Sequence, residues 1–127
     1  MKSKYLNEIG CEQTFSREKL DEEWEKIFEK EREEYGLASY DTWNLDITFF
    51  EFIYISFKMY NECNCVDTHF HKIIIDDEEW DMQKVINYII EISKKYLIQR
   101  NENFFEYDEI PEKFYTVLKI ALPYMWW

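Results

Sequence analysis

A chain of 127 residues can bury a hydrophobic core, and we expect it to form one domain over residues 1–127. The 27 acidic residues outnumber the 15 basic ones, and the net charge of −12 argues against direct binding to nucleic acid, which needs a basic surface. Two glycines and two prolines leave little turn chemistry for many strands. We therefore predict a mainly α fold, a compact bundle of about four helices around a hydrophobic central helix.

The N-terminal third is predicted to contain an arm and one long charged helix. Residues 1–15 form the arm, which lacks the apolar run of a signal peptide, and three cysteines without a leader fit a reducing cytoplasm. The helix begins after Ser16, a good N-cap residue, and ends near Gly36. Its apolar face is formed by Leu20, Trp24, Ile27 or Phe28, and Tyr35. Its acidic face includes Glu29, Glu33 and Glu34.

Residues 40–60 are the most hydrophobic stretch of the chain and are predicted to be the central helix. A hydrophobic stretch of about twenty residues is longer than an ordinary strand, so a helix is predicted. Asp46, Glu51 and Lys58 would each be costly in hydrocarbon, so we expect no membrane span and no membrane partner. We expect other helices to enclose this helix on nearly every side, with one narrow polar stripe left over. That stripe is formed by Asn44, Thr48, Glu51 and Lys58.

The connector after this helix contains the strongest candidate for a metal site. Thiolate and imidazole are the preferred ligands of zinc, and a turn at residues 66–68 could bring two cysteines and two histidines together. The four candidates are Cys63, Cys65, His69 and His71. Ligands two residues apart often span an ion poorly, so we favour the alternative, a connector that is merely rich in cysteine and histidine. Its end, residues 70–75, reads as a short extended segment.

Two further helices are predicted in the C-terminal half. Asp76 with Glu79 forms a capping-box arrangement that begins the third helix, whose apolar positions repeat at a spacing of three to four residues. The last helix begins at Pro111 and ends near Leu122. Residues 99–109 form a loop with inserted aromatics, and the apolar tail, residues 124–127, either folds back or meets a partner. The buried positions of these two helices are Met82, Val85, Ile86, Ile89, Ile92, Tyr96, Phe114, Val117, Leu118 and Ala121.

Part of the chain resembles a group of small phage and prophage proteins with a D-x-W-x-L-D helix, a loop and an E-W helix. The resemblance covers residues 36–98 and rests on Gly36, the run from Ser39 to Asp46, Phe52-Ile53, Lys58 and Glu79-Trp80. It implies no activity, but it implies an origin as a phage accessory protein that acts in the cytoplasm of a bacterial host cell. In structural terms we expect Trp43 and Trp80 to pack together, so that Trp43→Ala costs about 3–5 kcal/mol.

These observations favour a binding protein over an enzyme, because no phosphate loop, nucleophile elbow or zinc-protease motif is present. The leading hypothesis is a protein that inhibits or redirects a bacterial host protein, and a basic nucleic-acid-binding protein is one candidate partner. An anti-CRISPR protein is its most concrete version, a nucleic-acid mimic is a sub-case, and an immunity protein is physically equivalent. Its candidate contacts are Glu29, Glu33, Glu34, Phe104, Phe105, Tyr107, Trp126 and Trp127. The alternatives are a structural protein that self-associates through its C-terminus and a zinc module.

Overall fold

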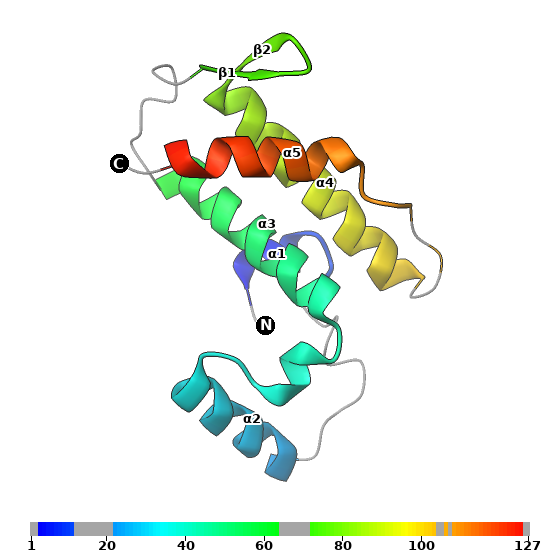
Figure 1. Ribbon diagram of the computed structural model, residues 1–127. Helices are drawn as coiled ribbons and strands as arrows, with labels where there is room; N and C mark the ends of the chain where they lie inside the picture. The colour runs from blue at the N-terminus through cyan, green and yellow to red at the C-terminus, as the bar shows by residue number, and fades with distance from the viewer. Residues whose placement is uncertain (1–2, 12–21, 64–71, 104–105, 107, 126–127) are drawn as a thin grey trace.

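The computed structural model describes residues 3–11, 22–63, 72–103, 106 and 108–125, and helices dominate it (Figure 1). The predicted mainly α, compact domain is confirmed. The α-helices are α1 (Lys4–Glu8), α2 (Glu22–Tyr35), α3 (Leu45–Cys63), α4 (Met82–Glu102) and α5 (Glu112–Ala121). Two 3-10 helices, η1 (Ser39–Thr42) and η2 (Leu122–Tyr124), and two strands, β1 (Lys72–Ile75) and β2 (Glu78–Asp81), complete the described part.

The hydrophobic core lies between α3, α4 and α5. Helices α3 and α4 pack against each other, and α5 crosses them (Figure 1). The Phe114 ring of α5 lies 5.5 Å from the Phe50 ring of α3, and Phe50 also contacts Tyr96 of α4 at 4.3 Å. On another side, α1 packs on α3, where the Tyr5 hydroxyl donates to Glu62 over 3.0 Å.

The apolar periodicities of α4 and α5 are confirmed. All the predicted positions are buried except Ile92, which is partly buried, because both helices place one stripe in the core. The loop predicted from residue 99 begins later, since α4 continues to Glu102. None of the described helices is both long and apolar enough to cross a membrane.

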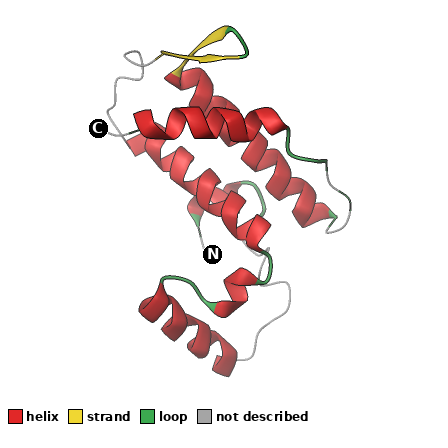
Figure 2. Cartoon of the chain, viewed as in Figure 1, coloured by secondary structure: helices red, strands yellow, loops and turns green. Residues whose placement is uncertain are grey.

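The two strands form an antiparallel hairpin that the sequence prediction recognised only in part (Figure 2). Ile75 pairs with Glu78, so the loop holds two residues, Asp76 and Asp77, with φ of 51° and 62°. Two left-handed residues are the signature of a type I′ turn. The predicted helix start at Asp76 is therefore wrong. Helix α4 begins at Met82, where the Asp81 carboxylate accepts a 2.7 Å bond from the Lys84 N–H.

Replacing Asp77 with glycine is expected to raise the free energy of unfolding by about 0.5–1 kcal/mol, because glycine adopts positive φ without steric cost. Chemical denaturation measures the change. Glu79→Gly, two residues on in the exposed part of strand β2, is the matched control and should lower the same free energy by about 0.5–1 kcal/mol. Equal effects of the two glycines would contradict the turn assignment.

The two tryptophans predicted to pack together lie in different environments. Trp80 of β2 is buried and its ring meets Tyr88 edge-on at 5.3 Å, while the ammonium groups of Lys84 and Lys113 lie 4.5 and 4.8 Å from its ring centre. Trp43 precedes α3 and is 70% exposed. The predicted Trp43–Trp80 contact is therefore wrong, and Trp80 instead attaches the hairpin to α4 and α5.

The burial of α3 differs from the prediction in part. Two residues of the predicted polar stripe, Thr48 and Glu51, are buried, and large apolar side chains face water instead. Thr48 tolerates burial because its hydroxyl donates to the Asp41 carbonyl oxygen over 2.6 Å. Helices α1, α4 and α5 pack against α3, but among the described residues part of its surface stays exposed, so α3 is not enclosed on nearly every side. The exposed apolar residues of α3 are Leu45, Phe49, Phe52 and Met59.

Candidate protein-binding surface

Helix α2 lies at the N-terminal end of α3, apart from the core helices (Figure 1), and contacts η1. Its sequence predicts an amphipathic helix with an apolar face, yet Phe28 alone is buried among its 14 residues, all of which the structure describes. Trp24 and Ile27, on the same face, are 54% and 47% exposed. An apolar helix face that the described part of the chain leaves exposed is typical of an interaction site.

Four aromatic rings connect α2 to the start of α3, and we call them the aromatic ladder. Trp24 stacks on Phe28 at 5.7 Å, Phe28 contacts Tyr40 of η1 at 5.2 Å, and Tyr40 contacts Trp43 at 4.9 Å. These separations lie within the range of favourable aromatic pairs. The buried Phe28 ring holds the middle of the ladder, and the two tryptophans are exposed at its ends.

Helix α3 carries further exposed apolar residues. Leu45, Phe49 and Phe52 are spaced by four and three residues, so they share one helix face, and all three are exposed. The exposed parts of Phe49, Phe52 and the two ladder tryptophans leave on the order of 450 Å² of aromatic surface in water, at ~200 Å² per side chain. Aromatic side chains are enriched at protein interfaces. We call the aromatic ladder with Ile27, Leu45, Phe49 and Phe52 the apolar surface.

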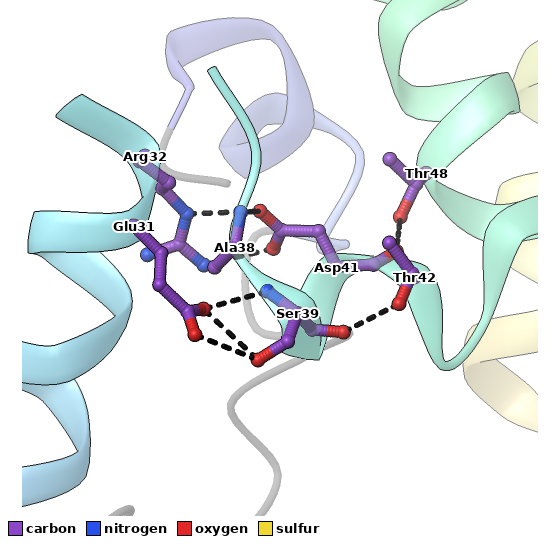
Figure 3. A network of polar contacts seen from close by, with 7 residues as sticks. All are labelled: Glu31, Arg32, Ala38, Ser39, Asp41, Thr42 and Thr48. Atoms are coloured by element: carbon purple, nitrogen blue, oxygen red, sulfur yellow. Dashed lines mark hydrogen bonds and ion pairs between the residues drawn. The ribbon is translucent and has the colours of Figure 1, made fainter. Parts of the chain in front are cut away.

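A polar cluster joins α2 to η1 (Figure 3). The Arg32 guanidinium donates to both oxygens of the Asp41 carboxylate, from Nε over 3.0 Å and from Nη2 over 2.8 Å. The Ala38 N–H donates to the same carboxylate over 2.9 Å. Glu31 accepts a 2.7 Å bond from the Ser39 N–H. We call the contacts of Arg32 and Ala38 with Asp41 the Asp41 clamp; charge-assisted, two-pronged bonds of this kind are strong and set orientation.

The clamp also fixes the charge of Asp41. Burial acts to raise the pKa of this carboxyl, but the hydrogen bonds from Arg32 and Ala38 outweigh it and hold the pKa below its ordinary value. The same contact raises the pKa of Arg32. Asp41 is therefore ionised at neutral pH, and the clamp is a lasting ion pair.

Replacing Asp41 with alanine is expected to release α2 and to cost about 2 kcal/mol locally, because a charge-assisted pair and a buried N–H acceptor are both lost. A helix of 14 residues is marginal in water without its packing partner. Amide hydrogen exchange should accelerate in α2 and stay unchanged in α4. In the control Ser39→Ala, the Glu31 carboxylate still accepts from the Ser39 backbone N–H, so α2 should stay protected. Unchanged α2 exchange in Asp41→Ala would contradict the role of the clamp.

Another buried carboxyl, Glu51 of α3, lies in the core. It is fully buried, and neither of its oxygens has a hydrogen-bond partner among the described residues. Burial raises the pKa of Glu51 to about 8, and the negative Asp41 adds to this effect. Glu51 is closed off from solvent, so its perturbed pKa reflects its burial in the core.

The residues predicted to bind a partner or metal are placed only in part. Glu29, Glu33 and Glu34 are exposed on α2, and successive helical steps of 100° put Glu29 and Glu33 opposite the apolar face. Cys63 is the last residue of α3, and Cys65, His69 and His71 lie outside the described residues, so the zinc site stays a prediction. Three loop aromatics and two terminal tryptophans also lie outside them: Phe104, Phe105, Tyr107, Trp126 and Trp127.

The residues of the apolar surface are not among the predicted partner contacts, because large apolar side chains are predicted to lie in the core. Trp24, Ile27, Trp43 and Phe52 are large and apolar, and nothing in the sequence separates such residues from buried ones. One signal was available. The apolar face of α2 adds to a chain that already has 20% aromatic residues, more than a domain of this size can bury.

No protein-family model, curated protein or solved structure matches the chain. The grounds for assigning a function are therefore the apolar surface, the clamp that positions it and the charge around it.

Proposed function

We propose that the chain acts by binding another protein, and that it inhibits or redirects a bacterial host protein by covering part of its surface. The observation that carries the proposal is the exposure of Trp24 and Trp43 on a surface that the Asp41 clamp holds in place. Tryptophan is enriched among the residues that dominate binding energy at interfaces, and a fixed side chain loses little entropy on binding.

Charge supports a basic protein partner. A net charge of −12 accelerates encounter with a positively charged surface and disfavours nucleic acid itself. A basic nucleic-acid-binding protein of a bacterium fits this charge, and the resemblance of residues 36–98 to small phage and prophage proteins supports the same setting. An anti-CRISPR protein is the most concrete form of this function.

The test is affinity capture of bacterial proteins by the tagged chain at low and then at high salt, followed by binding measurements with the purified captured protein. We expect the Trp24→Ala/Trp43→Ala double variant to lose about tenfold or more in affinity, as for interface anchors. The matched control is Ile74→Ala/Tyr115→Ala, which removes two exposed apolar side chains from the hairpin and α5. Failure to retain any protein at low salt contradicts the proposed function.

Self-association is the second candidate, because the apolar surface would also suit a second copy of the chain. Sedimentation equilibrium separates the two functions. A monomer at all concentrations supports binding to a different protein, whereas a dimer that the Trp24→Ala/Trp43→Ala variant dissociates supports self-association.

A further inference from the structure

We infer that the apolar surface receives a basic amphipathic helix of the partner protein, an inference that rests on the proposed function and specifies the chemistry of the occupant. The surface is built from faces of two helices, α2 and α3, joined through η1. Apolar helix faces are recognised by other helices through anchors spaced by three or four residues. Leu45, Phe49 and Phe52 present that spacing on α3, and Trp24 with Ile27 presents it on α2.

The charge of α2 selects a basic occupant. This helix carries seven glutamates against three basic residues, a net charge of −4, and Glu22, Glu23 and Glu25 lie in its first turn. A step of 100° per residue puts Glu23 and Glu25 on the two flanks of the helix position that Trp24 occupies. A lysine side chain can lay its methylene stem on the indole while its ammonium group reaches a carboxylate.

The same charge disfavours the other occupants of this surface. A second copy would bring another helix of net charge −4 to a surface that is already acidic, and like charges brought together cost several kcal/mol. Nucleic acid would bring phosphates to the same carboxylates. A basic helix satisfies both the apolar and the acidic parts of the surface.

The probe for the test is a synthetic 18-residue amphipathic peptide of leucine and lysine, labelled with fluorescein and titrated with the full chain. Fluorescence anisotropy should show binding that Trp24→Ala/Trp43→Ala weakens about tenfold or more. Glu22→Gln/Glu23→Gln/Glu25→Gln should weaken it about fivefold at low salt, with a smaller difference at physiological salt because exposed charges are screened. Circular dichroism checks that each variant keeps its helices.

Three controls make the result specific. Ile74→Ser/Tyr115→Ser removes exposed apolar side chains elsewhere, and Glu91→Gln/Glu102→Gln/Glu109→Gln makes the same change of charge outside α2, so both should bind like the wild type. A lysine peptide of equal charge without leucine should bind about tenfold more weakly, because it offers no apolar face.

Equal binding of the two peptides, or equal binding by the tryptophan variant and the wild type, overturns the inference. So does a dimer in sedimentation that the tryptophan variant dissociates, since the occupant would then be a second copy. If a captured host protein depends on Trp24 and Trp43 but the leucine–lysine peptide does not bind, the proposed function stands and the basic helix is excluded. If no host protein is retained, the proposed function fails whatever the peptide does.

Discussion

Replacing Glu51 with glutamine is expected to raise the free energy of unfolding by about 3–4 kcal/mol at pH 8 and to change it little at pH 4.5. Glutamine has nearly the same shape but no charge, so it keeps the packing of α3 and removes the ionisation. Urea denaturation of both proteins over this pH range measures the difference.

The direction of the change in the free energy of unfolding follows from the proton that Glu51 retains in the folded state. The ordinary pKa of glutamate is 4.5, and burial raises the pKa of Glu51 to about 8 in the folded protein. Between these values the unfolded chain releases the proton and the folded protein holds it. The wild type is therefore expected to lose stability as the pH rises from 4.5 to 8, with little further loss from this group above that.

Two variants complete the Glu51 experiment. Glu102→Gln, at an exposed position, should leave the wild-type pH profile unchanged. Glu51→Leu should stabilise the protein at every pH, because it also removes polar atoms that have no partner among the described residues. If wild type and Glu51→Gln gave parallel profiles, the burial of an uncompensated carboxyl would be refuted.

Replacing Trp80 with alanine is expected to lower the free energy of unfolding by about 3–5 kcal/mol, whereas Trp43→Ala should lower it by about 1 kcal/mol. Trp80 is buried and contacts Tyr88 and two lysines, and its loss leaves a cavity under the hairpin. Trp43 is 70% exposed and loses mainly its contact with Tyr40.

Denaturation of the two alanine variants at one pH measures both losses of unfolding free energy, and each variant serves as the control for the other. The expected ranking is reversed for binding to a partner, in which Trp43→Ala should have the larger effect. Equal losses of stability would indicate that Trp43 is buried in the core, as the sequence predicts. Trp43 would then not belong to the apolar surface.

Helices whose apolar and polar residues alternate clearly could be predicted from the sequence in detail. In α4 and α5 the contrast between Val85 or Phe114 and the charged residues around them marks one face, and that face is the buried one. The start of α4 was misplaced because aspartate is favoured both as a helix cap and in a type I′ turn. Only the pairing of β1 with β2 distinguishes the two roles of Asp76.

The burial of α3 could not be predicted in the same way. Most residues of α3 are apolar and they fall on every side of the helix, so its periodicity has little contrast, and a stripe of polar residues predicts an exposed side. The structure buries Glu51 and exposes Phe52, because which side is covered depends on where α1, α4 and α5 pack. The candidate surface escaped prediction for the same reason, since a sequence identifies an apolar face but not whether the chain covers it.

The attachment of α2 has a consequence for cooperativity. A helix held through one buried phenylalanine and an ion pair contributes little to the core that α3, α4 and α5 share. Heating should therefore melt α2 before the rest, so the calorimetric enthalpy should exceed the van't Hoff value and a single melting temperature should not describe the whole chain. Occupation of the apolar surface by a partner would merge the two transitions into one.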